Sequence, residues 1–282
     1  MTPAAEQDGG ARLLQKAAAL EARLTALGSV LVAYSGGVDS AFLAVTATRV
    51  LGDRALCVTA DSPSYPDHHR DLAIGTARAF NLRHEMVLTS EVEHPEYRAN
   101  PANRCYYCKH ELYTHLRAIA RTRGFEAVVD GSNADDRGDY RPGRQAAREF
   151  GVLSPLDDVG LTKDEIRALA RRAGMSTWDE PASACLSSRI PYHTEVTEEK
   201  LRTIDAAERV LRDLGFRVCR VRHHDTIARI ELGREDIARA LEPDVAATID
   251  RELRALGYAH VTIDLRGYRL GSLNEALKLR PV

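Results

Sequence analysis

The chain has 282 residues, the size of one large or two modest domains and enough to bury a hydrophobic core without disulfide bonds. Its 39 basic and 41 acidic residues give a formal net charge of −2, which disfavours a general nucleic-acid binder that follows the phosphate backbone. The composition, 44% hydrophobic and 28% charged, is that of an ordinary globular protein. No apolar run approaches the ~18 residues that cross a bilayer, and no secretory signal is visible, so we expect a cytoplasmic protein.

The first half of the chain alternates short apolar runs with amphipathic segments. Strands that alternate with helices indicate βαβ crossovers, so we expect an α/β fold with a parallel sheet covered by helices on both faces. A disordered lead is expected over residues 1–10. The predicted helices cover residues 12–27, 39–51, 66–80 and 105–123, and the predicted strands cover 30–34, 55–60, 84–88 and 127–130.

The pattern changes after Pro155. Thr162 followed by Glu165 forms a capping box that predicts a helix over 162–173. Two alternating runs across a His224-Asp225 turn predict a hairpin. We expect two domains, 1–176 and 177–282, the second a smaller α+β domain. Its predicted elements are an irregular stretch over 178–191, a helix over 198–214, the hairpin over 217–222 and 226–232, two further helices, and a strand over 259–265.

The segment Ser35-Gly36-Gly37-Val38-Asp39-Ser40 follows a predicted buried strand and opens a predicted helix. Glycines let the backbone turn tightly, and a helix N-terminus attracts anions, so the segment favours a phosphate-binding loop. Asp39 would repel a bare phosphate, and its presence implies a cation such as Mg²⁺. No lysine follows the glycines, so this is not the common loop in which a lysine reaches the phosphates. The alternative interpretation is a simple glycine-rich turn.

Three cysteines form a candidate site. Cys105 and Cys108 lie three residues apart, which is one helical turn, and Cys185 stands far along the chain. Three thiolates leave one corner of a 4Fe–4S cluster open, which suits an exchangeable fourth position. A redox pair formed by the first two cysteines and simple burial remain alternatives. Cys57 and Cys219 are expected to fill the core.

Several motifs together indicate a family. The loop Ser35–Ser40 resembles the SGGxDS loop of the PP-loop ATP pyrophosphatases, which cleave ATP between the α- and β-phosphates and adenylate an acceptor oxygen. With the segments 103–109, 130–136, 141–144 and 184–192, the chain resembles the LarE family, the ATP-dependent sulfur transferases of nickel-pincer nucleotide biosynthesis. The similarity covers most of residues 12–275.

This resemblance implies an enzyme that uses Mg²⁺ and ATP to adenylate a carboxylate of pyridinium-3,5-biscarboxylic acid mononucleotide and then replaces oxygen by sulfur. In three-cysteine members a 4Fe–4S cluster is thought to carry an extra sulfide, whereas other members sacrifice the sulfur of the cysteine that matches Cys185. Because this chain has all three cysteines, we expect the cluster form. The resemblance also implies a homo-oligomer, with the ATP pyrophosphatase chemistry in residues 1–176 and substrate binding and oligomerisation in 177–282. The sulfur donor stays open.

The family pattern assigns roles to residues outside the cysteines. Asp135 and Asp136 either contact Mg²⁺ or ribose or cap a helix, the role of Trp178 is open, and His193 stands where the family has glycine, so the turn there is expected to differ. For the arginines that the family pattern suggests as substrate-binding residues, the alternative interpretation is that they lie on an edge strand exposed to solvent. The expected nucleotide-binding residues are Ser35, Gly36, Gly37, Asp39, Ser40, Ala60, Asp61 and Gly131, with Asp39 also holding Mg²⁺, and the expected substrate-binding residues are Ser188, Arg189, Arg220, Arg222, Glu208 and Glu231.

Other functions compete with this interpretation. A PP-loop tRNA thiolase also uses three cysteines, but binding tRNA calls for a basic surface that the overall charge does not indicate. An amide-forming synthetase would not need the cysteine trio. A nucleotide sensor or a scaffold that carries the cluster would bind ATP without turnover.

Overall fold

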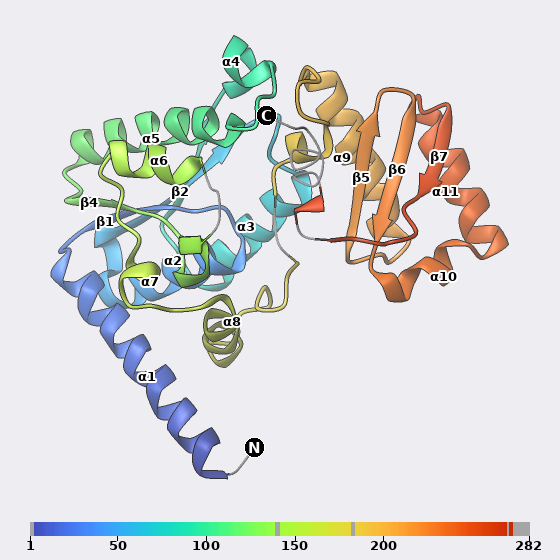
Figure 1. The fold of residues 1–282 in the computed structure, drawn as a ribbon. Helices are drawn as coiled ribbons and strands as arrows, with labels where there is room; N and C mark the ends of the chain where they lie inside the picture. Colours follow the sequence, from blue (N-terminus) through green and yellow to red (C-terminus); the bar gives the residue numbers. More distant parts are fainter. Residues whose placement is uncertain (1–2, 139–141, 182–183, 270, 273–282) are drawn as a thin grey trace. The chain divides into compact units, whose positions relative to one another are not determined.

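A computed structural model divides the chain into two compact units, each with its own sheet (Figure 1). The structure describes residues 3–138, 142–181, 184–269 and 271–272, so residue 141 of the segment 141–144 lies outside the description. The first unit comprises residues 1–62, 69–91 and 103–180, and the second comprises 63–68, 92–102 and 181–282. Two short segments from the first half of the chain therefore belong with the C-terminal unit.

The first unit is built on a four-stranded sheet in the order β3-β2-β1-β4, in which every neighbouring pair is parallel. Val32 in the central strand pairs with Cys57 on one side and Val129 on the other. From β1 the chain adds β2 and β3 on one side of β1, and it later adds β4 on the other side. The carboxyl end of β1 is therefore a topological switch point, where α/β proteins bind ligands. The strands are β1 Val30–Ala33, β2 Ala55–Asp61, β3 His84–Leu88 and β4 Ala127–Val129.

Helices cover both faces of this sheet, as predicted. Val30 and Val32 point into one core with Phe42 of α2, and Leu31 points into the opposite core with Leu116 of α5. Alternation along β1 therefore fills two separate hydrophobic layers. The helices are α1 Pro3–Ala26, α2 Val38–Leu51, α3 Asp67–Ala79, α5 Arg104–Arg123, α6 Gly143–Glu149, α7 Pro155–Asp158 and α8 Lys163–Arg172.

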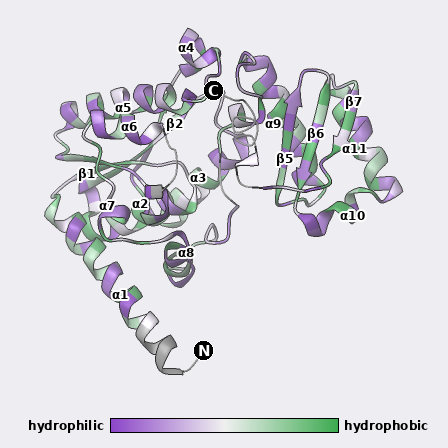
Figure 2. Cartoon of the chain, in the orientation of Figure 1, coloured by the Kyte–Doolittle hydropathy of each residue, from purple (hydrophilic) through white to green (hydrophobic). Residues whose placement is uncertain are grey.

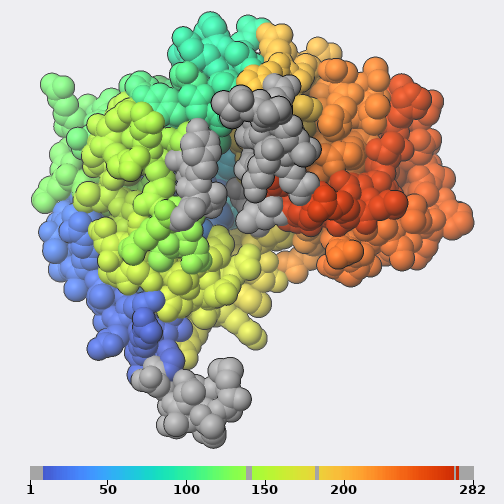
Figure 3. All heavy atoms as spheres, viewed as in Figure 1, coloured from blue at the N-terminus to red at the C-terminus, as the bar shows by residue number. Residues whose placement is uncertain are grey.

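The N-terminal helix α1 is longer than predicted, because it begins at Pro3. The expectation of a disordered lead is wrong for residues 3–10, where proline in the first turn and two alanines favour a helix. Lys16 and Arg23 attach α1 to the segment that runs from α7 through α8, by ion pairs with Glu165 of α8 and Asp158 of α7. In Figure 3 the blue atoms of α1 lie against the yellow-green atoms of this segment.

The second unit contains a three-stranded sheet in the order β5-β6-β7. The predicted hairpin is confirmed, since β5 and β6 are antiparallel, and β7 adds to β6 in parallel. Val221 and Ile230 from the sheet pack with Leu211 and Phe216 in one core. The α/β fold class with a smaller second sheet is therefore confirmed. The elements are α4 Pro95–Arg98, α9 Glu198–Asp213, β5 Cys219–His224, β6 Ile227–Leu232, α10 Ile237–Ala240, α11 Pro243–Ala255 and β7 His260–Ile263.

The helices of both units are amphipathic. Figure 2 shows hydrophilic and hydrophobic residues side by side along them, as expected for helices with one buried face. Among the helices formed by the described residues, none has the length and apolar character needed to cross a bilayer.

The predicted capping box of α8 is present: the Thr162 hydroxyl accepts from the Glu165 N–H at 3.3 Å, and Glu165 Oε2 accepts from the Thr162 N–H at 2.9 Å. We expect Thr162→Ala to lower the free energy of unfolding by about 1 kcal/mol, because one helix N–H loses its partner. Urea denaturation measures this loss. Thr25→Ala is the matched control, since the exposed Thr25 hydroxyl only donates back to the Glu21 carbonyl. A loss no larger than in the control would contradict the prediction.

Candidate active site

The loop Ser35–Ser40 lies at the carboxyl end of β1 and leads into the N-terminus of α2. The Ser40 hydroxyl organises the loop: it accepts from the Ser35 N–H at 3.1 Å, lies 3.0 Å from Ser35 Oγ and donates to the Gly37 carbonyl at 3.0 Å. The backbone is thereby fixed in a compact turn ahead of a fourteen-residue helix. Such a turn presents amide N–H groups and a positive helix end to an anion.

Two glycines allow the loop to be approached closely. Gly36 has a φ of +69°, and a Cβ there would lie 2.9 Å from the Cβ of Ala73. A Cβ on Gly131, just beyond β4, would lie 2.8 Å from the Ser40 backbone nitrogen. A side chain at either position would clash, at Gly36 with α3 and at Gly131 with the backbone at the start of α2, so both positions require glycine.

Asp39 forms an ion pair with Lys163, the first residue of α8, at 2.6 Å. The Lys163 backbone N–H donates to Asp135 Oδ2 at 2.8 Å, so Asp135 has the helix-capping role that was one of its two predicted alternatives. Asp136 Oδ2 accepts from the Asn133 N–H at 3.0 Å within its own turn. No sequence signal pairs Asp39 with Lys163, because 124 residues separate them.

The structure also places the other expected residues of the first unit. Asp61 ends β2 and accepts from Arg70 Nε at 3.0 Å, while Ala60 packs at the edge of the core beneath α5. Trp178 packs against the opposite core, with the Arg171 guanidinium 4.9 Å from its ring centre.

The five cysteines fall into two groups. Cys57 and Cys219 are buried, as predicted, and burial raises the pKa of each thiol to about 12, so both stay protonated at neutral pH. Cys105 is exposed and Cys108 half-buried at the start of α5 in the first unit, and Cys185 is half-buried in the second unit. The described residues include no group of three or more His, Cys, Asp or Glu side chains arranged to hold a metal ion.

Arg189 fixes the backbone that carries Cys185. Its guanidinium forms a fork on Glu208 with N–O distances of 2.8 and 2.9 Å, and both side chains are 1% exposed. Arg189 Nη1 also donates to the carbonyls of Ala184 at 2.6 Å and Cys185 at 2.9 Å. Burial by itself would raise the pKa of Glu208, but Arg189 lowers it to about 2. The charged pair thus sets the position of the cysteine segment.

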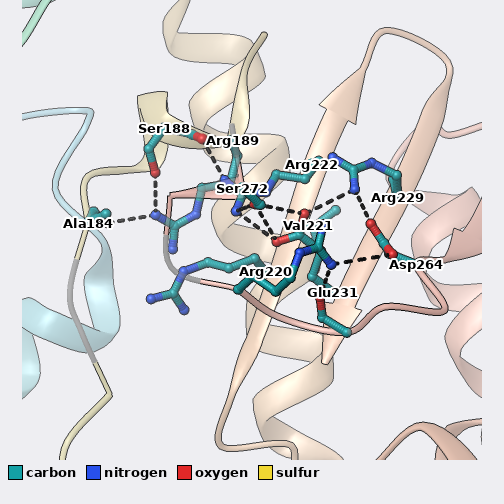
Figure 4. A network of polar contacts seen from close by, with 12 residues as sticks. Ala184, Ser188, Arg189, Arg220, Val221, Arg222, Arg229, Glu231, Asp264 and Ser272 are labelled. Carbon is teal, nitrogen blue, oxygen red and sulfur yellow. Dashed lines mark hydrogen bonds and ion pairs between the residues drawn. The ribbon is translucent and has the colours of Figure 1, made fainter. Parts of the chain in front are cut away.

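Arg222 on β5 joins a second buried group, which Figure 4 shows beside Arg189. Its guanidinium donates to the Ser188 carbonyl at 2.7 Å, to Glu231 Oε2 at 2.7 Å and to Ser272 Oγ at 2.8 Å. Arg222 is 5% exposed and Glu231 is fully buried. The structure therefore brings Ser188, Arg189, Arg222, Glu208 and Glu231 together within the second unit.

Arg220, two residues before Arg222, is 7% exposed, and its guanidinium lies 5.2 Å from the ring centre of Tyr268. Because both arginines are buried, the alternative of a solvated edge strand is wrong. Burial, and after it the neighbouring Arg189, lower the pKa of Arg220. Sequence reasoning missed the residues that complete this network, which come from distant segments: Arg229, Asp264, Tyr268 and Ser272.

His193 keeps a backbone conformation that glycine usually supplies, with a φ of +67°. Asn100 holds this turn: its carbonyl accepts from the His193 N–H at 2.9 Å, and its amide donates to the carbonyls of Pro191 at 2.8 Å and Thr194 at 3.0 Å. His193 thus has the positive φ that a glycine would allow, and tertiary hydrogen bonds offset the strain of its side chain there.

We expect Glu208→Gln to lower the free energy of unfolding at pH 7 by about 3–5 kcal/mol, because Arg189 is left as a buried, uncompensated charge. In the unmodified chain this stabilisation is present above pH 4.5, the ordinary value, and is lost as the pH falls towards 2, since the unfolded state takes up the proton first. Denaturation at a series of pH values measures both effects. The exposed Glu198→Gln is the control, and an equal loss in both variants would contradict the prediction.

Comparison with known proteins identifies the family. No protein-family model matches the chain. The chain is 44% identical to an uncharacterized protein of Synechocystis over 89% of this chain and 94% of that protein. It is 38% identical to the pyridinium-3,5-bisthiocarboxylic acid mononucleotide synthase of Lactiplantibacillus plantarum over 95% and 96% of the two chains. A glutamine-hydrolyzing GMP synthase of Streptococcus agalactiae is 25% identical over 65% of this chain and 39% of its own. With its fold and its phosphate loop, the chain belongs to the LarE-like PP-loop ATP pyrophosphatases and is an ATP-dependent enzyme.

Proposed function

We propose that the chain is a sulfur transferase that forms AMP and pyrophosphate and converts a carboxylate of pyridinium-3,5-biscarboxylic acid mononucleotide into a thiocarboxylate. The observation that carries the proposal is the 38% identity, over 95% of the chain, to a protein named for the bisthiocarboxylic acid product. The loop Ser35–Ser40 at the N-terminus of α2, the partly exposed cysteines and the buried arginines supply the chemical groups that this reaction requires.

The first step activates the carboxylate. A substrate carboxylate oxygen attacks the α-phosphorus of ATP, and the bond to the β-phosphate oxygen breaks to release pyrophosphate. The loop Ser35–Ser40 and Gly131 hold the phosphates, and Ala60 and Asp61 lie beside the nucleoside. Asp39 is the carboxylate that would hold Mg²⁺, which neutralises charge on the departing pyrophosphate when it is bound. Residues 1–176 carry this step.

Residues 177–282 bind the substrate, which carries two carboxylates and a phosphate. Arg220 and Arg222 suit these anions because guanidinium groups donate paired hydrogen bonds to both. Ser188 contributes a hydroxyl, while Glu208 and Glu231 keep the arginines in place. Arg189 has its guanidinium directed at Glu208 and the Cys185 segment, so its part is to position that segment.

Sulfur replaces AMP in the second step: the sulfur nucleophile attacks the carbonyl carbon and AMP departs. Cys105, Cys108 and Cys185 are the residues that would hold a 4Fe–4S cluster, which supplies a bound sulfide when present. These three cysteines are exposed or half-buried, whereas the other two are buried and protonated. We also propose that the chain forms a homo-oligomer. The alternative source of sulfur is Cys185 itself.

Anaerobic incubation with Mg²⁺, ATP and the biscarboxylate mononucleotide tests the function. We expect AMP, pyrophosphate and a thiocarboxylate, and we expect Asp39→Ala to lower AMP formation by at least about 100-fold because charge on the leaving group is no longer compensated. Asp53→Ala, on an exposed 3₁₀ turn, is the control and leaves the rate unchanged. Full AMP formation by Asp39→Ala would refute the mechanism, and sulfur transfer to tRNA in place of the mononucleotide would favour a tRNA thiolase.

The source of sulfur is tested by anaerobic reconstitution, quantitation of iron and sulfide, and mass spectrometry after turnover. We expect bound iron in the unmodified chain, its loss in Cys105→Ser and Cys108→Ser, and its retention in the control Cys219→Ala. Cys185 keeps its mass if the cluster delivers the sulfide. A mass loss of about 34 Da at Cys185 without bound iron would show the sacrificial route instead.

A further inference from the structure

The phosphate loop has no lysine of its own, yet the structure places a lysine beside it. Lys163, at the start of α8, extends to Asp39 in the loop with an Nζ–Oδ2 distance of 2.6 Å. Helices α2 and α8 pack against each other within the first unit. A cation is therefore supplied to the loop by a residue 124 positions further along the chain.

Lys163 is fixed at its backbone and remains accessible along its side chain. Its N–H donates to Asp135 at 2.8 Å, and the preceding loop is attached through the Ala134 N–H, which donates to the Leu161 carbonyl at 2.9 Å. The Lys163 side chain is 30% exposed and that of Asp39 is 21% exposed. The start of the lysine side chain is thus held in place, while its ammonium retains contact with solvent and with any ligand of the loop.

The N-terminal helix braces the same segment. Lys16 of α1 donates to the Gly160 carbonyl at 2.7 Å and pairs with Glu165 at 2.6 Å. Glu165 also closes the cap on Thr162, the residue before Lys163. Burial by itself would raise the pKa of Glu165, but the hydrogen bonds from Lys16 and Thr162 lower it, so Glu165 stays charged. These contacts of Lys16 and Glu165 fix the position of the backbone at Lys163.

The charge at this site explains what the lysine does. Asp39 adds a negative charge where the phosphates of ATP bring several more, and the Mg²⁺ that Asp39 would hold balances only part of it, so the loop favours further positive charge. An ammonium on a flexible four-carbon stem has three donors and can contact a carboxylate and a phosphate. We propose that Lys163 is a nucleotide-binding residue whose ammonium, paired with Asp39 in the structure, contacts the β- and γ-phosphates of ATP bound at this loop. This proposal rests on the use of ATP and deepens it.

The competing explanation is that the ion pair only holds α2 against α8. In that case the loss of Lys163 would weaken binding of every nucleotide equally, through a displaced loop, and would lower stability. A phosphate contact predicts a different pattern, because AMP lacks the β- and γ-phosphates. The comparison of ATP with AMP therefore separates the two explanations.

Isothermal titration calorimetry with ATP and with AMP, in the presence of Mg²⁺ and in EDTA, tests the proposal. We expect Lys163→Met to weaken ATP binding by about 10- to 100-fold, because charge-assisted hydrogen bonds to the phosphates are lost, and AMP binding by less than about threefold. Lys163→Arg retains most of the ATP affinity since it keeps the charge. Lys200→Met is the matched control, because Lys200 lies in the second unit and is 3.9 Å from Asp225. Equal losses for ATP and AMP, or none, would overturn the proposal.

A second measurement uses the unmodified chain and does not depend on the folding of a variant. Amine-reactive labelling followed by mass spectrometry reports the accessibility of each lysine. We expect ATP to protect Lys163 and AMP to leave it reactive, with Lys200 unaffected by either. Reactivity of Lys163 that ATP does not change would overturn the inference. A chain that binds ATP but fails these tests refutes only the role of Lys163, whereas a chain that binds no ATP refutes the proposed function.

Discussion

The charges at the N-terminus of α2 must balance, and this constraint governs how the helices of the first unit are arranged around the loop. The loop that we propose binds the phosphates of ATP also carries Asp39, and two like charges about 4 Å apart repel each other by about 4 kcal/mol near a protein surface. Lys163 of α8 compensates the charge of Asp39 by an ion pair. Hydrogen bonds made by Asp135 and Lys16 hold the segment that carries Lys163 in place. The helices α1 and α8 therefore position the charges of the loop as well as covering the sheet.

In the second unit, too, charges must be compensated, and here they are buried. Guanidinium and carboxylate groups are expensive to bury, and they stay buried only when each is closely paired. Two ion pairs meet this condition, Arg189 with Glu208 and Arg222 with Glu231. Arg189 also donates to the carbonyl of Cys185, and Arg222 donates to the carbonyl of Ser188 three residues later. Such a network contributes a fixed geometry around the cysteine more than it contributes stability.

The cysteines show how environment divides one residue type into different roles. Cys57 lies within β2 and Cys219 at the start of β5, where burial keeps their thiols protonated. Cys105 and Cys108 stand on the first turn of α5 within reach of solvent, and Cys185 precedes a 3₁₀ turn. The protonated thiols of Cys57 and Cys219 are not available for metal binding or for chemistry, because the thiolate is the reactive form.

The sequence by itself determined the local features: the four parallel strands, the phosphate loop with its helix, the capping box at Thr162 and the hairpin of the second unit. Each depends on residues a few positions apart, which is the range over which periodicity and capping act. Only the tertiary structure decided that Lys163 pairs with Asp39 of the loop, that residues 63–68 and 92–102 belong to the C-terminal unit, and that Asn100 holds His193 at positive φ. These contacts join residues distant in the chain, and the packing of helices on sheets selects them, so no local pattern records them.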